Sequence, residues 1–193
     1  MIISLSHLSV GYSLSHPVIS DIDLELKSGQ LSCLIGENGI GKSTLLKTLT
    51  GFLPKLKGSV LFDNRDITSF SQRELARQVS IVLTQKPDVQ NLTIEEIIGL
   101  GRSPYTGFFG RLRIDDRMVV NDAIATMGIE KLRGRMIQTL SDGERQKVMI
   151  AKALAQETPV ILLDEPTAFL DFTSKADNFQ SLHRMEHDTH KHI

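Results

Sequence analysis

The fold is decided by Gly36-Glu37-Asn38-Gly39-Ile40-Gly41-Lys42-Ser43-Thr44, which fits the phosphate-binding pattern G-x-x-x-x-G-K-S/T. Before it, residues 31–35 form a short, mostly apolar run that predicts a buried parallel strand. After it, residues 44–49 have the apolar spacing of a helix that stops at Gly51. Strand, loop and helix are the context in which this pattern binds the phosphates of a nucleoside triphosphate. The structural alternative is a glycine-rich turn that merely caps a helix.

Each part of this loop has a chemical reason. Glycines allow a tight turn whose backbone N–H groups point at the phosphates, and the N-terminus of the following helix adds partial positive charge. Lys42 is expected to reach the β- and γ-phosphates, and Ser43 to place its hydroxyl on Mg²⁺. We therefore expect the nucleotide to be held by Gly36, Asn38, Gly39, Gly41, Lys42, Ser43 and Thr44.

Composition and charge narrow the class of protein. The chain has 193 residues, 40% of them hydrophobic, which predicts one α/β domain. The formal net charge is -1, so charge indicates neither a nucleic-acid partner nor a polybasic membrane anchor. No apolar run is long enough to span a membrane and the N-terminus lacks the features of a secretory signal, so we expect a cytosolic chain. Cys33, the single cysteine, cannot form an internal disulfide and is predicted to pack in the core.

The N-terminal region predicts antiparallel strands. Apolar and polar residues alternate there, with apolar positions at Ile3, Leu5, Val10, Ile22, Leu24 and Leu26. Tyr12 lies where the first strand ends, and its ring could stack on a base. A half-buried packing residue is the alternative for Tyr12.

The region after the loop helix predicts a strand at residues 58–64, which enters a turn, and a short helix opened by the capping box of Ser71 and Glu74. Residues 81–83 then form the next buried strand. Gln85 follows this strand at the edge where open α/β sheets bind ligands, although an isolated glutamine there would be read as a surface residue.

Residues 91–135 predict a small helical insert. It opens with a capping box at Thr93 and Glu96 and ends with a helix that stops at Gly128. Between the helices, residues 99–110 contain Pro104, Tyr105, Phe108 and Phe109. These side chains are either a contact surface or part of a loop that folds onto its own domain.

Two further stretches carry candidate site residues. Ser141 and Glu144 form a capping box, so the following helix offers a second N-terminus that binds either an anion or only water. Residues 160–163 are a fully apolar strand that delivers Asp164 and Glu165 at its end. Such carboxylates can divide the work, with Asp164 in the Mg²⁺ shell and Glu165 polarising an attacking water. A pair of surface acids is the alternative.

The last part of the chain has helical spacing from residue 172 to residue 182. Four of the six histidines follow at positions 183, 187, 190 and 192. They could bind a metal ion or lie on a solvated helix face.

In order, these motifs resemble the nucleotide-binding subunits of ABC transporters over essentially the whole chain. The resemblance implies that Tyr12 stacks on adenine and that Gln85 links metal, water and the membrane partner. It also implies that the signature loop at residues 140–144, with Ser141 and Gly143, faces the γ-phosphate of ATP bound by the opposite subunit.

The remaining site residues follow from the same resemblance. Asp164 corresponds to the Mg²⁺-shell aspartate, Glu165 to the catalytic glutamate and Asp171 to the aspartate of the subunit-contacting loop. The implied metal ligands are Ser43, Gln85 and Asp164, and the implied cofactors are ATP and Mg²⁺. The expected fold is an α/β P-loop ATPase core of the ABC type, with an N-terminal antiparallel β subdomain and a helical insert.

Some residues depart from the common family pattern. The common signature L-S-G-G-Q is Leu-Ser-Asp-Gly-Glu at residues 140–144, and Phe169 replaces the usual alanine. The aspartate form, together with residues 101–105, resembles the branch that serves importers of iron-siderophores, haem and cobalamin.

The resemblance also implies an assembly. Two copies would sandwich two ATP molecules as a homodimer and drive integral membrane permease subunits, as a peripheral protein on the cytoplasmic face of the inner (plasma) membrane. A single ABC ATPase domain would span residues 1–193, divided into 1–90, the insert 91–135, and 136–193. We expect a chain that is truncated at its C-terminus, because the family's later strand and histidine have no counterpart. The alternatives are a non-transport ABC-type ATPase and an ATP-dependent dimerisation module.

Overall fold

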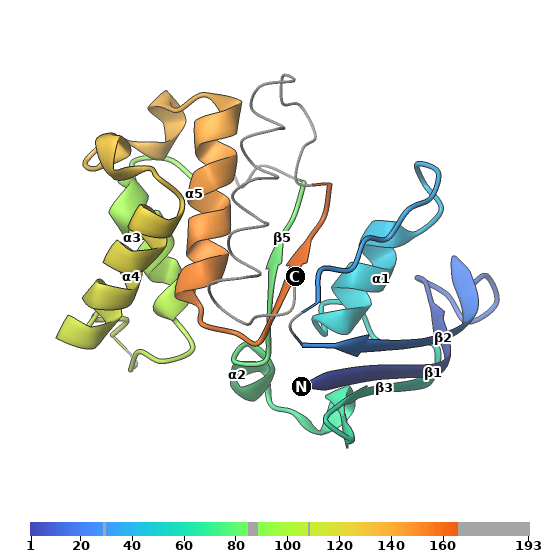
Figure 1. The fold of residues 1–193 in the computed structure, drawn as a ribbon. Coiled ribbons are helices and arrows are strands. Elements are labelled where there is room, and N and C mark those ends of the chain that lie inside the picture. The colour runs from blue at the N-terminus through green and yellow to red at the C-terminus, as the bar shows by residue number, and fades with distance from the viewer. Residues whose placement is uncertain (29, 85–88, 108, 166–193) are drawn as a thin grey trace.

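The computed structural model describes residues 1–28, 30–84, 89–107 and 109–165. Figure 1 shows an antiparallel sheet at the N-terminal side, the helix α1 with the strands β5 and β6 in the middle, and the helices α3, α4 and α5 on the far side. None of the helices in the described ranges is long and apolar enough to cross a membrane.

The N-terminal sheet contains β1 (Ile2–Val10), β2 (Ile19–Lys27), β3 (Lys57–Phe62) and β4 (Arg65–Asp66). Its order is β2-β1-β3-β4, and every neighbouring pair is antiparallel, which confirms the prediction from alternating residues. The apolar side chains on one face of this sheet share a core with α1 (Lys42–Leu49). That packing sets the position of the helix that begins at the phosphate-binding loop.

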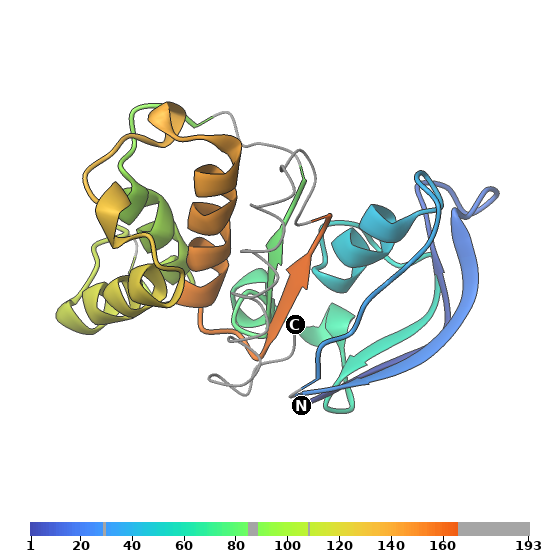
Figure 2. The same cartoon turned by 45° about the horizontal axis from the view of Figure 1, so that its top comes forward.

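A parallel strand pair lies beyond α1, between that helix and α5 (Figures 1 and 2). The strands are β5 (Val79–Val82) and β6 (Val160–Leu163), paired from Val79 with Val160 to Val82 with Leu163. Their side chains join two cores, because Val79 and Val160 pack toward the N-terminal sheet whereas Val82 and Ile161 pack toward the helices.

The helices of the far side share one apolar core with these strands. They are α3 (Ile94–Gly99), α4 (Ile114–Thr126) and α5 (Asp142–Ala155), and a short helix, α2 (Gln72–Leu75), precedes β5. Short 3-10 turns η1 to η4 lie at Ile67–Ser69, Leu100–Arg102, Glu130–Leu132 and Ile137–Thr139.

The helix ends were well predicted from the sequence. Side chain and backbone exchange hydrogen bonds in all three predicted capping boxes, at the start of α2, α3 and α5. Gly128, with a φ of 62°, follows the end of α4 as expected.

One predicted strand is wrong. Residues 31–35 are not part of any described strand, and Ile35 is 88% exposed. Cys33 is exposed as well, so its predicted place in the core is also wrong. An apolar run becomes a strand only when a neighbouring strand takes its backbone hydrogen bonds, and the described parallel sheet contains only β5 and β6.

Residues 99–110 were predicted to be either a contact surface or a loop folded onto its own domain, and each interpretation fits part of the stretch. Pro104 is buried, and its carbonyl accepts hydrogen bonds from Arg73 Nε at 2.8 Å and from Arg77 Nη2 at 2.9 Å. The Tyr105 ring lies 4.1 Å below the Arg102 guanidinium. This half of the stretch folds onto its own domain, whereas Phe109 is 84% exposed and Phe108 lies outside the described residues.

Candidate nucleotide-binding site

The phosphate-binding loop ends in a turn that only glycine can make. Gly41 precedes α1 with a φ of 109°, and Gly39 has a φ of 84°. A Cβ atom at Gly41 would lie 2.6 Å from Val18 Cγ1 and 2.9 Å from Ile19 Cγ1. The start of β2 therefore presses directly on the loop, and a side chain at residue 41 would push the two apart.

The Lys42 side chain folds back onto the backbone of its own loop. Its ammonium Nζ donates to the carbonyl oxygens of Gly36 at 2.7 Å and Glu37 at 2.8 Å. The cation is thus held over the loop, where phosphate oxygens can take the place of the carbonyls as acceptors.

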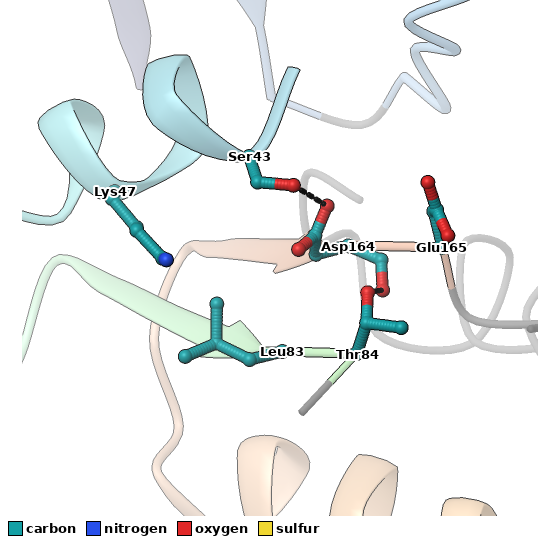
Figure 3. A pocket seen from close by; sticks show the side chains of 6 residues that line it. All are labelled: Ser43, Lys47, Leu83, Thr84, Asp164 and Glu165. Atoms are coloured by element: carbon teal, nitrogen blue, oxygen red, sulfur yellow. Dashed lines mark hydrogen bonds between the residues drawn. The ribbon is translucent and has the colours of Figure 1, made fainter. Parts of the chain in front are cut away.

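Ser43 and Asp164 meet across the two halves of the chain. The Ser43 hydroxyl donates to Asp164 Oδ1 at 2.8 Å, although the two residues are 121 positions apart (Figure 3). Asp164 is buried, and its backbone N–H continues the ladder by donating to the Val82 carbonyl at 2.8 Å. Thr84 donates its hydroxyl to the Asp164 carbonyl at 2.8 Å. The ends of both parallel strands are thereby tied to the helix that carries the loop.

Two adjoining hollows surround this contact. One has a volume of about 230 Å³ and is lined by Ser43, Lys47, Leu83, Thr84, Asp164 and Glu165. The other has a volume of about 130 Å³ and is lined by Gly39, Gly41, Lys42, Ser43, Thr44 and Glu165. Both predicted carboxylates and five of the predicted loop residues line these hollows, whereas Gly36 and Asn38 line neither.

The two adjacent carboxylates have different surroundings. Figure 3 shows the Asp164 carboxylate turned toward Ser43, whereas the Glu165 carboxylate points in another direction. Glu165 has a φ of 48° and is exposed, so the chain turns sharply as it leaves β6. One acid is held by a neighbour, and the other is open to solvent at the rim of both hollows.

The residues present fit a hard divalent cation. A hydroxyl oxygen and a carboxylate oxygen, both from rigid elements, are the kind of ligands that Mg²⁺ takes from proteins. In this structure the Ser43 hydroxyl and the Asp164 carboxylate bond to each other, so both oxygens already face one point.

Three residues that line the larger hollow are not among the predicted site residues, namely Lys47, Leu83 and Thr84. Lys47 follows Ser43 by one turn of α1, and Figure 3 shows its side chain directed into the space beside Leu83. The helical spacing from Ser43 could have pointed to it. Thr84 acts through its hydrogen bond to the backbone carbonyl of Asp164, directly after β6, and no pattern in the sequence signals this contact.

Tyr12 is 71% exposed, so the alternative of a half-buried packing residue is wrong. It follows Gly11, whose Cβ position would lie 2.9 Å from the backbone nitrogen of Val18. Because Val18 also contacts Gly41, the tyrosine belongs to the strand end that borders the phosphate-binding loop.

The signature residues lie apart from this site. Ser141 and Gly143 are at the N-terminus of α5, on the opposite side of β5 and β6 from α1 (Figures 1 and 2), and they line neither hollow. The Ser141 hydroxyl accepts from the backbone N–H of Glu144 at 3.3 Å, as a helix cap does. Gln85, Asp171, Phe169 and the four C-terminal histidines lie outside the described residues.

The chain is similar in sequence and in fold to known proteins of one family. Residues 19–168 match the profile of the family described as ABC transporter. The chain is 42% identical over 171 residues to an uncharacterized ABC transporter ATP-binding protein of Methanocaldococcus jannaschii, covering 89% of this chain and 59% of that protein. It is 36% identical over 184 residues to FhuC, the iron(3+)-hydroxamate import ATP-binding protein of Bacillus subtilis, covering 95% of this chain and 68% of that protein.

Among solved structures, the chain is similar to cbiO1 from Clostridium perfringens, part of the ABC transporter complex cbiONQ. The TM-score is 0.85 at 28% sequence identity, and the match covers 99% of this chain and 76% of that chain. The predicted α/β fold, with its N-terminal antiparallel sheet, is confirmed by this likeness and by the described strands.

Proposed function

The chain belongs to the ABC transporter family, and from this premise we propose that it binds and hydrolyses ATP to power a membrane importer of metal chelates. The observation that carries the proposal is the 2.8 Å hydrogen bond from Ser43 to Asp164. It brings the hydroxyl of the phosphate-binding loop and the carboxylate of a distant strand to one point, as a nucleotide with its cation requires.

ATP binding rests on the loop and the helix behind it. Gly39, Gly41, Lys42, Ser43 and Thr44 line the smaller hollow, and their backbone N–H groups together with the Lys42 ammonium would hold the β- and γ-phosphates. The exposed ring of Tyr12 would stack on the adenine. Ser43 and Asp164 would hold Mg²⁺, which when bound neutralises part of the phosphate charge.

Hydrolysis needs a group that orients and deprotonates water, and Glu165 is the residue proposed for this role. Its carboxylate lines both hollows and is free of the bond that holds Asp164. As water attacks the γ-phosphorus and the bond to the β-phosphate oxygen breaks, Glu165 would accept the proton, leaving ADP and phosphate. Gln85, which follows β5 by three residues, completes this proposal as the link between water, metal and the membrane partner.

A second copy of the chain is the proposed partner at the nucleotide. Ser141 and Gly143 line neither hollow of their own chain. In this proposal they serve ATP held by the other copy, together with Asp171. The paired subunits would lie on the cytoplasmic face of the plasma membrane, against permease subunits.

The proposed cargo is an iron chelate or a related compound such as haem or cobalamin. The name of the Bacillus subtilis relative supports this class, and so do the residues at 101–105 and the aspartate at position 142.

Phosphate release tests the proposal. The full chain is assayed with ATP and Mg²⁺, first alone and then with permease subunits in lipid nanodiscs, beside the Glu165→Gln variant. The proposal expects hydrolysis that depends on Glu165 and rises when permease is present. Hydrolysis without a response to any permease would indicate a non-transport ATPase, and nucleotide-driven dimerisation without hydrolysis would indicate a signalling module.

A further inference from the structure

A cluster of one histidine and two aspartates lies on the N-terminal sheet, and its members line neither hollow of the nucleotide-binding site. His7 Nδ1 is 2.8 Å from Asp21 Oδ1 and 3.7 Å from Asp23 Oδ2. One ligand atom from each of the three side chains lies within 4.8 Å of the other two. We propose that His7, Asp21 and Asp23 bind a divalent transition-metal ion, with Zn²⁺ as the best fit.

A β-bulge brings the three side chains to the same face. The pairing of β1 with β2 shifts register between Leu5 and Leu8, so one part of β1 has to kink. His7 has a φ of 46°, which turns its ring toward Asp21 and Asp23, alternate residues of β2. Without the bulge, residue 7 would simply continue the alternation of the strand.

The neighbouring strand β3 is adapted to this bulge. Gly58 has a φ of 77°, and a Cβ atom there would lie 2.4 Å from the carbonyl oxygens of both Ser6 and His7. The kinked backbone therefore presses against β3 at a position where only glycine fits. The conformation of His7 is set from both sides of its strand.

Backbone contacts also orient one of the carboxylates. The His7 backbone N–H donates to Asp23 Oδ1 at 2.9 Å, which leaves Oδ2 on the side of the imidazole. Ligands of a tetrahedral Zn²⁺ with bonds of about 2.0–2.1 Å are roughly 3.4 Å apart. The observed separations of 2.8 and 3.7 Å bracket this value, so small rotations of the side chains suffice.

The donor set selects the class of ion. An imidazole nitrogen with two carboxylate oxygens suits Zn²⁺, Co²⁺ or Ni²⁺, whereas Mg²⁺ and Ca²⁺ prefer oxygen ligands alone. Two ionised carboxylates also balance the charge of a dication. The three side chains are exposed, at 79%, 74% and 59%, so the ion can enter from solvent and complete its shell with water.

Zinc titration of the untagged full chain tests this site, with a chromogenic chelator as competitor. The variants are His7→Asn and Asp21→Asn, because asparagine tolerates the left-handed backbone of both positions. His16→Asn is the matched control, since His16 is also an exposed histidine near this sheet and its Nδ1 lies 3.0 Å from the Ser15 hydroxyl, away from the two aspartates. All variants keep the C-terminal histidines, whose zinc binding is therefore the same background throughout.

We expect His7→Asn and Asp21→Asn to lower the affinity of this zinc site about tenfold or more, and His16→Asn to leave it unchanged. In long-range ¹H–¹⁵N spectra of the wild type, Zn²⁺ should shift Nδ1 of His7, the nitrogen that faces the aspartates. Circular dichroism without metal shows whether each variant is folded. Equal zinc affinity of His7→Asn and His16→Asn, or a zinc response confined to other histidines, would overturn the proposal and leave only an exposed ion pair.

Discussion

At the scale of single residues, the Lys42 ammonium can donate hydrogen bonds to two different sets of acceptors. In this structure it donates to the carbonyls of Gly36 and Glu37, and in the proposed complex it donates to phosphate oxygens. Hydrogen bonds between charged partners are shorter and stronger than those to neutral carbonyls, so ATP would win the competition.

Lys42→Ala should therefore weaken ATP binding by about ten- to a hundredfold, the effect of losing charged hydrogen bonds worth about 1.5–3 kcal/mol. Titration calorimetry with Mg²⁺ measures the affinity. Lys57→Ala, which removes an exposed lysine from β3, is the matched control and should bind as the wild type does. An unchanged affinity in Lys42→Ala would contradict the proposed role.

Glu165→Gln separates binding from hydrolysis. The amide keeps the shape of the side chain and does not accept a proton, so hydrolysis should fall by about two to four orders of magnitude while ATP binding remains. Gel filtration with ATP should then show a stable dimer, because the nucleotide between the subunits persists. A variant that releases phosphate at the full rate would place the general base at another residue.

At the scale of elements, the start of α5 combines a helix cap with the proposed contact to a second subunit. The Ser141 backbone N–H donates to Glu144 Oε2 at 2.8 Å, and this bond is the main reason why the pKa of the Glu144 carboxyl lies below its ordinary value. Arg135 Nη1, at 3.2 Å from Glu144 Oε1, acts in the same direction. The cap is thus strongest when the glutamate is ionised.

The stability that this cap adds should depend on pH. Because the folded pKa is lowered, the contribution is fully present above about pH 4.5, where glutamate is ionised in the unfolded chain as well, and it is lost as the pH falls through the folded pKa. Glu144→Gln keeps a side chain that can accept the same bond but has no charge. The stability difference between wild type and variant, measured by urea unfolding, should shrink from pH 6 to pH 3. A constant difference would show that ionisation of Glu144 adds nothing.

At the scale of the whole molecule, Arg102 links segments that are far apart in sequence. Its buried guanidinium donates to Asp116 Oδ1 at 2.9 Å, to the Ala155 carbonyl at 2.9 Å and to Glu157 Oε2 at 2.7 Å. These bonds join the start of α4 to the end of α5, just before β6 begins. The helices of the far side are thereby tied to the strand that carries Asp164.

Arg102→Ala should lower the free energy of unfolding by about 3–5 kcal/mol, because it leaves the buried Asp116 without its cation. Arg133→Ala is the matched control, since Arg133 contacts Asn121 and Glu95 at the surface and should lose at most about 1 kcal/mol. Urea unfolding at neutral pH compares the two variants. Equal losses would mean that burial of the Arg102 network adds no stability.

Most of the local structure could be predicted from the sequence. The capping boxes, the glycine turns at Gly41 and Gly128, and the strand at residues 160–163 are all found as expected. Each depends on residues within a few positions of one another, whose hydrogen bonds and backbone angles are set locally. The ordered motifs also identified the family.

By itself, then, the sequence determined the elements and the chemistry of the loop, because propensity, caps and apolar spacing act over short distances. Only the tertiary structure decided that Ser43 meets Asp164 across 121 positions, that residues 31–35 do not form a described strand, and that His7 turns toward two aspartates. These outcomes depend on which strands pair and in what register. The free energy of such pairing comes from contacts between distant segments, and no local pattern records them.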